Sequence, residues 1–389
     1  MRRRGTGVLP EPSTHRAGLS GVKRITGLRR AVGLAVVVAL FAMLLATSGA
    51  EAKGGSKFFG LNWSGHHDRD WSEKDARKLR ESGAKTVRWS MFWARIERSP
   101  GQFDWSTTQD KVVGDLAAKG IKVLPILSGT PSWLADSPSK PPLDSKKERD
   151  AWKEYLREAV KRYGPQGAYW SGPYQADHPG KSARPITIWQ VWNEPNLDSH
   201  WKPHPSPSGY AHLLELSHKA IEDASPRAKV MFAGMPGYSI QINAWDFLRS
   251  VYHQHGARNA FDIAALHPYS HNPRQMLHSV KHMRKVMHKQ GDGQKPLWIT
   301  EIGWGSLPKN ATPYHLTKGR KGQARILKRS FQALQKKRHR WHIGRVLWFN
   351  FRDPRGGSGQ GCAFCSSAGL LENDFTPKPS WSAFRSFTH

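Results

Sequence analysis

The chain has 389 residues, 38% of them hydrophobic, which suits one large α/β domain and exceeds what a small sandwich domain needs. Its formal net charge of +30 favours anionic partners such as acidic polysaccharides, anionic cell-wall polymers or a membrane surface, although a solvated basic surface is the alternative. No nucleic-acid-binding motif of recognised spacing accompanies the basic residues, so we expect no nucleic acid partner.

Residues 1–52 have the organisation of an export signal. A basic stretch that ends at Arg30 precedes an apolar run over residues 31–46, and a small-x-small cleavage pattern ends at Ala52. The apolar run is shorter than the roughly 20 residues of a stable membrane span, and an uncleaved membrane anchor is the alternative. We therefore expect a secreted or cell-surface protein that contacts a membrane only through this segment if it stays uncleaved.

From residue 53 onward, near-continuous apolar runs alternate with amphipathic helical stretches. Such runs are typical of parallel strands that are covered on both faces. We predict eight strands, at Phe58–Asn62, Lys85–Phe92, Lys122–Leu127, Ile186–Asn193, Lys229–Gly234, Asp262–His267, Leu297–Ile302 and Arg345–Phe351.

Helices are predicted after each strand, several of them from a serine at the start and a glycine just past the end. Their ranges are Ser72–Gly83, Ser106–Lys119, Ser145–Tyr163, Ser208–Ala224, Ala244–His255, Pro273–Lys289, Gly319–Lys337 and Ser380–Phe387. Residues 164–185 and 353–367 are predicted to be long loops. The strict alternation predicts a single (β/α)₈ TIM barrel over residues 53–389, and no G-x-G-x-x-G follows the first strand to indicate a dinucleotide.

Cys362 and Cys365 are the two cysteines of the chain, spaced C-x-x-C. A zinc site would need further ligands of similar spacing, and a redox pair would need a thioredoxin-like context; neither is near. Because an exported chain meets an oxidising compartment, we predict a small structural disulfide that pins a loop.

Seventeen tryptophans are unusual for one domain. Buried indoles need partners for their N–H groups, so an excess of tryptophan suggests aromatic surfaces that line a cleft, where sugar faces can stack. An ordinary place in the core is the alternative for any single tryptophan.

Two glutamates stand at the ends of predicted strands, where a barrel of this kind carries its catalytic residues. Glu194 follows the fourth strand in Trp189-Gln190-Val191-Trp192-Asn193-Glu194-Pro195, and Glu301 lies in the seventh, in Trp298-Ile299-Thr300-Glu301-Ile302-Gly303-Trp304. A charged side chain within an apolar strand costs desolvation energy unless it is partnered or functional. A buried structural carboxylate is the alternative for either glutamate alone, and it fits the pair poorly.

These motifs resemble those of the retaining β-glycosidases with (β/α)₈ barrels, known as clan A. Within the clan, Phe59-Gly60-Leu61-Asn62 and Thr376-Pro377-Lys378-Pro379-Ser380-Trp381 are most similar to glycoside hydrolase family 39 and to related family 5-like enzymes. Asn193-Glu194-Pro195 is similar to the clan's acid/base motif, and Thr300-Glu301-Ile302-Gly303 is similar to its nucleophile strand. Members of family 39 that act on xylosides usually carry a β-sandwich after the barrel. This chain stops about one helix after the eighth strand, which favours a short bacterial member acting on exopolysaccharides.

The resemblance implies roles for further residues. Arg88 would support the nucleophile, Asn193 would donate to a sugar hydroxyl, and His267 and Tyr269 would form the sixth-strand pair. Trp348 would be the sugar platform, and Trp304 a second candidate.

The function that we expect is hydrolysis of O-glycosidic bonds in a polysaccharide or oligosaccharide, with acidic glycans as candidates. No metal or organic cofactor is expected, because two carboxylates suffice. Endo-action is favoured over exo-action, and transglycosylation differs only in the acceptor of the intermediate. The alternative from a different class is a non-catalytic carbohydrate- or cell-wall-binding barrel.

Overall fold

The computed structural model describes residues 57–64, 71–239, 241–311, 315–354 and 362–389. Residues 55–389 form one compact unit. The predicted export signal at 1–52 lies outside the described residues. Within the described ranges, no helix is both long and apolar enough to cross a membrane.

Eight parallel strands form the barrel in the order β7-β6-β5-β2-β1-β10-β9-β8. Their bounds are β1 (Phe59–Asn62), β2 (Thr86–Phe92), β5 (Lys122–Ser128), β6 (Ile188–Val191), β7 (Lys229–Met231), β8 (Ala264–Leu266), β9 (Leu297–Ile302) and β10 (Ile343–Trp348). A parallel bridge between Met231 and Ile263 joins the two edge strands, so the sheet closes. The predicted (β/α)₈ barrel is confirmed, with each strand within a few residues of its predicted place.

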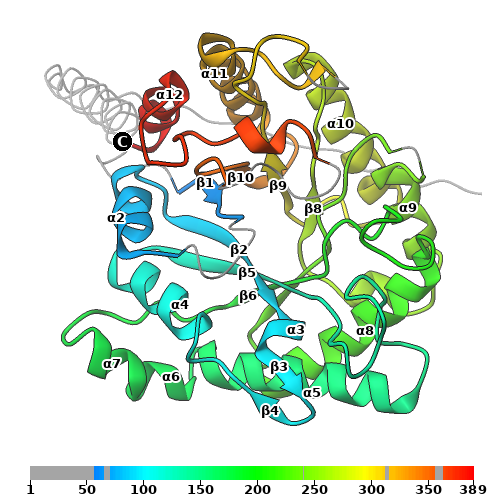
Figure 1. The fold of residues 1–389 in the computed structure, drawn as a ribbon. Coiled ribbons are helices and arrows are strands. Elements are labelled where there is room, and N and C mark those ends of the chain that lie inside the picture. The colour runs from blue at the N-terminus through cyan, green and yellow to red at the C-terminus, as the bar shows by residue number, and fades with distance from the viewer. Residues whose placement is uncertain (1–56, 65–70, 240, 312–314, 355–361) are drawn as a thin grey trace, which may run out of the picture. The chain divides into compact units, whose positions relative to one another are not determined.

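Helices surround the strands (Figure 1). They are α2 (Glu73–Glu81), α4 (Gln109–Ala118), α5 (Lys146–Tyr163), α8 (Pro207–Ala224), α9 (Ala244–Tyr252), α10 (Pro273–Lys289), α11 (Arg320–Lys337) and α12 (Pro379–Thr388). Ser72 and Ser145 each begin a helix with a capping box, in which the serine accepts from a backbone N–H and an acidic side chain returns the bond. The capping residues in the sequence therefore predicted these helix starts correctly.

Short elements in the connections were not predicted. Helix α3 (Trp93–Ile96) and the hairpin of β3 (Glu97–Ser99) and β4 (Gln102–Phe103) follow β2. Two more short helices, α6 (Ala168–Ser171) and α7 (Pro173–Asp177), lie in the segment that we predicted to be a loop. Elements this short have too little periodicity to be seen in sequence, because their stability comes from tertiary packing.

Tryptophans fill the core instead of lining a cleft. All of them except Trp133 and Trp341 are buried. Several of them donate the indole N–H to a protein acceptor; Trp152, for example, donates to Ser217 Oγ at 2.9 Å, and Trp192 donates to the carbonyl of His200 at 2.8 Å. The expectation of a tryptophan-lined cleft is therefore wrong, and the alternative that we kept open describes this chain.

Candidate active site

Glu194 and Glu301 meet at the carboxyl-terminal end of the barrel. One carboxylate oxygen of each lies within 4.8 Å of the other and of a ring nitrogen of His267. Both side chains are largely buried, with 12% and 11% of their surface exposed. The residues that we predicted from two separate motifs thus share one site, which opens to solvent at the end of the strands.

The backbone around Glu194 is strained. Trp192 has φ 68° and Glu194 has φ 49°, both in the left-handed region that side chains with a Cβ rarely adopt. The Glu194 N–H donates to the carbonyl of Gly234 at 2.9 Å, which fixes this turn against the next strand. Backbone strain of this kind costs about 1–3 kcal/mol and is concentrated at functional sites.

Arg88 on β2 binds both Glu301, the nucleophile candidate, and Asn193, the residue before Glu194. Its Nη1 donates to Glu301 Oε1 at 2.5 Å, and its Nη2 donates to Asn193 Oδ1 at 2.7 Å. Its Nε donates to Gln190 at 2.6 Å, and Nη1 also reaches Asn62 at 3.0 Å. The guanidinium is almost fully buried, so these bonds fix its position and leave the amide nitrogen of Asn193 available to a ligand.

Tyr269 donates its hydroxyl hydrogen to Glu301 Oε2 at 2.7 Å. Burial and the neighbouring Glu301 carboxylate raise the pKa of Tyr269 well above its usual value, so the hydroxyl stays protonated. Both oxygens of Glu301 therefore accept a hydrogen bond, one from Arg88 and one from Tyr269. These two bonds favour the ionised carboxylate, which is the form that a nucleophile needs.

Two histidines contact Glu194, one at each oxygen. His267 Nδ1 lies 2.6 Å from Oε1 and is fully buried, whereas His200 Nε2 lies 3.7 Å from Oε2 and is 40% exposed. Burial raises the pKa of Glu194, but the hydrogen bond to His267 and the charges of His200, His267 and Arg88 lower it below its usual value overall. The positive neighbours of Glu194 therefore outweigh the effect of its burial on the pKa.

Trp348 and Trp304 lie behind the site and are fully buried. Their rings are 6.0 Å apart, and their indole N–H groups donate to the carbonyls of Ala368 and Ser270. Because no ring face is open, the burial of both indoles contradicts the sugar-platform role that we predicted. The two indoles instead bind segments that follow strand ends, at Ser270 after β8 and at Ala368 after β10.

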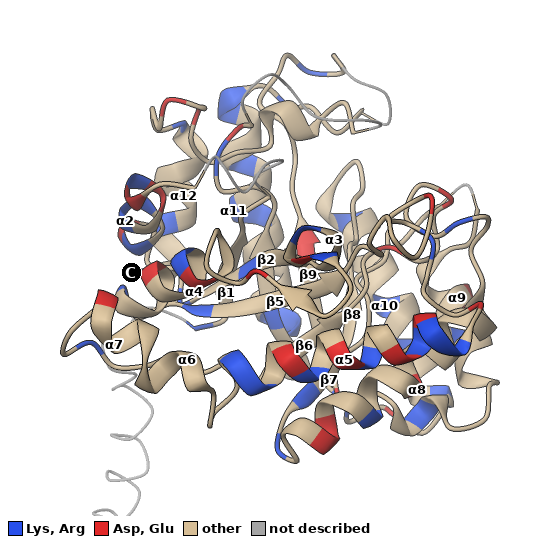
Figure 2. Ribbon diagram, turned by 60° about the horizontal axis from the view of Figure 1, so that its bottom comes forward, with Lys and Arg blue, Asp and Glu red and all other residues tan. Residues whose placement is uncertain are grey.

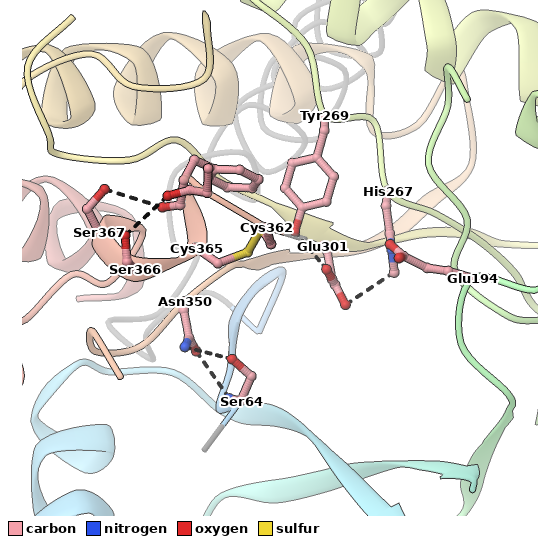
Figure 3. The surroundings of a disulfide bond; sticks show 12 residues. Ser64, Glu194, His267, Tyr269, Glu301, Asn350, Cys362, Cys365, Ser366 and Ser367 are labelled. Carbon is pink, nitrogen blue, oxygen red and sulfur yellow. Dashed lines mark hydrogen bonds and ion pairs between the residues drawn. A yellow bond between two sulfur atoms is a disulfide. The ribbon is translucent and has the colours of Figure 1, made fainter. Parts of the chain in front are cut away.

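Cys362 and Cys365 form the predicted disulfide, with their Cα atoms 5.4 Å apart. The turn that it closes leads into η4 (Cys365–Ser367) and lies beside the catalytic end of the barrel (Figure 3). Phe364, inside this turn, packs edge-on against Tyr269 with ring centroids 5.3 Å apart. The disulfide loop therefore supports the tyrosine that contacts Glu301.

Among the described residues, one group has ligand atoms for a metal ion close together: Glu194, His267 and Glu301. The guanidinium of Arg88 lies 2.5 Å from Glu301, and its positive charge opposes binding of a cation. Hydrogen bonding between His267 and Glu194 also occupies two of the ligand atoms. The donor set is therefore better suited to proton transfer.

Three neighbours of the site were missed in the sequence: His200, Gln190 and Asn62. His200 lies six residues after Glu194, and its position in the loop after the fourth strand was the available signal. Gln190 and Asn62 stand inside predicted strands at their buried faces, where a polar side chain needs a partner. The need for a hydrogen-bond partner could have indicated that Gln190 and Asn62 contact another buried polar group, here Arg88.

Comparison with protein families gives a match that spans more than half of the chain. The model described as "Glycosyl hydrolase catalytic core" matches residues 167–375. The chain belongs to this family. A second model, described as "Beta-galactosidase", matches residues 63–204. Comparison with curated protein sequences gives no match.

Solved structures of glycoside hydrolases share the fold of this glycosyl hydrolase. A family 39 enzyme of Bacteroides cellulosilyticus aligns with TM-score 0.64 and 20% identity, over 86% of this chain and 64% of that one. A β-xylosidase of Caulobacter crescentus aligns with TM-score 0.61 and 18% identity, over 86% and 69%. A family 5 enzyme of Streptomyces cattleya in complex with Manβ1-4GlcNAc aligns with TM-score 0.61 and 16% identity, over 86% and 80%.

The fold and the family membership agree with the resemblance that the sequence motifs predicted. At these identities the structural likeness concerns the fold of the barrel. The chain spans 64% of the length of the family 39 enzyme, so its activity and substrate are argued below from its own residues.

Proposed function

We propose that this chain is a retaining β-glycosidase in which Glu301 is the nucleophile and Glu194 the general acid/base. The observation that carries the proposal is the spacing of the two carboxylates, which approach within 4.8 Å. Retaining enzymes hold their carboxyl groups about 5–5.5 Å apart, whereas inverting enzymes leave about 6.5–9.5 Å for a water molecule. The shorter spacing favours direct attack on the sugar.

In the first step, a Glu301 oxygen bonds to the anomeric carbon while the bond from that carbon to the leaving oxygen breaks. Glu194 gives its proton to the leaving oxygen, and a glycosyl-enzyme ester remains on Glu301. Arg88 and Tyr269 fix the orientation of the Glu301 carboxylate. Fixed geometry of this kind lowers the barrier, because the reacting atoms need not be aligned anew.

In the second step, Glu194 takes a proton from water, whose oxygen attacks the anomeric carbon and releases Glu301. The amide nitrogen of Asn193 can donate to a sugar hydroxyl, because its oxygen already accepts from Arg88. When a sugar replaces water as acceptor, the same steps give transglycosylation. The low pKa of Glu194 means that the acid form needed for the first step grows as pH falls, so we expect an acidic optimum.

The proposed substrate is a β-linked polysaccharide or oligosaccharide. The names of the similar proteins point the same way, with a β-xylosidase, a complex with Manβ1-4GlcNAc and a β-galactosidase family model. Residues 1–52 support export, and we propose that the enzyme acts outside the cytoplasm. An acidic glycan would suit the net charge of +30.

Reducing-sugar release from a panel of neutral and acidic β-glycans tests the proposal. We expect the wild-type protein to release sugar from at least one of them. Glu301→Gln should lower the rate by at least about a thousandfold, because the covalent step needs a carboxylate. Glu154→Gln, on the exposed face of α5, is the matched control and should leave the rate unchanged.

Release that survives Glu301→Gln would contradict the assignment of the nucleophile. No release from any glycan by a folded protein would favour a binding protein that has kept the barrel.

A further inference from the structure

Two adjacent helices on the outside of the barrel carry basic residues without any acidic ones. Helices α10 and α11 pack against each other, and neither contains an aspartate or a glutamate. Their exposed basic side chains include Lys281, Lys285, Lys289, Lys321, Lys328 and Arg329. We call this surface the α10–α11 basic face.

Helix α5 has a comparable number of basic residues, but its charges are paired. Lys146 lies 2.5 Å from Asp150, and Lys161 lies 2.9 Å from Glu158. Blue and red residues alternate along α5 in Figure 2. Among the described residues, none of the six side chains named for the α10–α11 basic face forms an ion pair. Their charges are therefore available to a partner, and those of α5 largely are not.

Acidic residues close to this face have other partners. Asp292 is buried and pairs with Arg258 and Lys295, and Glu372 pairs with Arg320. Glu372 thus neutralises Arg320 at the start of α11, but neither carboxylate pairs with any of the six side chains named for the α10–α11 basic face. The unpaired charge is thus a property of the folded surface as well as of the composition.

A groove of about 560 Å³ runs along the start of this face. Arg274, His278 and Lys281 line it together with the rings of Tyr238 and Trp341. Tyr238 is 51% exposed, and its hydroxyl lies 2.7 Å from His278 Nδ1, which orients both rings. Aromatic rings beside cationic side chains suit a chain of anionic sugars, because sugar faces stack on rings while carboxylates pair with cations.

We infer that the α10–α11 basic face binds an anionic polysaccharide outside the catalytic pair, which goes beyond the proposed glycosidase activity. The groove begins at Asn272, three residues after Tyr269, so a polymer held there would lie next to the catalytic end of the barrel. Bound in this way, the enzyme stays on the polymer between reactions.

Other polyanions fit this surface less well. Tyr238 and Leu307 are the large hydrophobic side chains that are exposed in the described part of the chain, which leaves little apolar surface to insert into a membrane. No nucleic-acid-binding motif accompanies the basic residues.

Binding of polygalacturonate to the full-length protein, measured by titration calorimetry, tests this inference. The fully methyl-esterified polymer is the matched ligand, because it keeps the backbone and loses the charge. We expect polygalacturonate to bind and the ester to bind at least about tenfold more weakly, since counterion release needs charged groups. The affinity should also fall as salt rises.

The test variant combines Lys281→Gln, Lys285→Gln, Lys328→Gln and Arg329→Gln. Its control removes the same charge from α5, through Lys146→Gln, Lys153→Gln, Arg157→Gln and Lys161→Gln. We expect at least about a tenfold loss of affinity for the test variant only. Trp341→Ala keeps every charge and should also weaken binding, which separates the groove from the general field.

Equal loss in the two charge variants would overturn the inference, because general attraction would then explain the binding. Tighter binding of duplex DNA or of phosphatidylglycerol vesicles than of polygalacturonate would overturn the choice of a polysaccharide. Glu301→Gln should bind polygalacturonate as the wild type does, so failure of this inference and failure of the glycosidase proposal are distinguishable.

Discussion

Glu194 has a histidine near each of its oxygens, and the two histidines differ in distance and in exposure. His267 is fully buried between the two carboxylates, with Nε2 3.6 Å from Glu301, whereas His200 reaches solvent. Burial alone would raise the pKa of this carboxyl. The positive neighbours have the larger effect and lower the pKa of Glu194 below its usual value. The protonation of the acid/base therefore depends on residues from two different loops.

His200→Gln should move the basic limb of the pH profile of kcat/KM to higher pH. The protonated imidazole lowers the pKa of Glu194, so its removal raises that pKa and keeps the acid form to higher pH. His204→Gln is the control, because His204 lies on the same loop but pairs with Asp198 at 3.5 Å. An unchanged limb, or a shift to lower pH, would show that His200 does not act on Glu194.

Tyr269→Phe should lower kcat by about a hundredfold, because it removes one of the two bonds that hold Glu301. The control is Tyr252→Phe, where a buried tyrosine donates to Asp292 at 2.9 Å away from the site. Steady-state kinetics of both variants, corrected for the folded fraction, should show a large loss of kcat for Tyr269→Phe and little loss for Tyr252→Phe. Similar losses in kcat would indicate a general effect on folding.

At the scale of elements, the segment after β10 is anchored by a buried ion pair. Lys378 at the start of α12 has a fully buried side chain and lies 2.5 Å from Asp353. Lys378 also donates to Ser306 and to the carbonyl of Ser367, in the turn that supports Tyr269. The pair therefore connects the last helix to the loop that covers the catalytic end.

Asp353→Asn should lower the free energy of unfolding by about 3 kcal/mol, because it removes the nearer carboxylate from a buried ammonium and leaves it that of Glu372, 3.9 Å away. Chemical denaturation at neutral pH measures this change. Asp144→Asn, at the exposed pair with Lys140, is the control and should have no measurable effect. A small effect at Asp353 would mean that Glu372 and the neutral partners are enough to stabilise the Lys378 ammonium.

Regular elements of this barrel could be predicted because their signals are local. Apolar runs marked the strands, and capping serines such as Ser72 and Ser145 marked helix starts. Helix α3 could not be predicted, because its stability depends on contacts distant in sequence, such as the stacking of Trp93 on Tyr155 at 5.4 Å. The same limit explains His200, whose distance to Glu194 is set by the fold of a loop.

At the scale of the whole molecule, the barrel brings five strand ends together at one site. Asn62, Arg88, Glu194, Tyr269 and Glu301 lie on five different strands or in the segments that follow them, and the ion pair of Arg88 with Glu301 joins residues 213 positions apart. The motifs predicted which residues would meet, because strand ends of a barrel share one face. Sequence could not reveal that Trp348 is covered, since this depends on how the last loop packs.

The acidic residues are distributed unevenly over the outer helices of the molecule. Acidic residues are present along α5 and absent from the sequences of α10 and α11, although the total charge alone would suggest an even basic surface. The net charge of the chain does not reveal which basic side chains form ion pairs, because that depends on how the helices lie in the folded protein.

The central claim is that Glu301 attacks the sugar directly, and the anomeric configuration of the first product tests it. Proton NMR during early turnover of a β-linked substrate, before mutarotation, distinguishes the two outcomes. We expect the β-anomer to appear first, because two displacements at the anomeric carbon restore its configuration. First appearance of the α-anomer would mean that water attacks in a single step and would contradict the role assigned to Glu301.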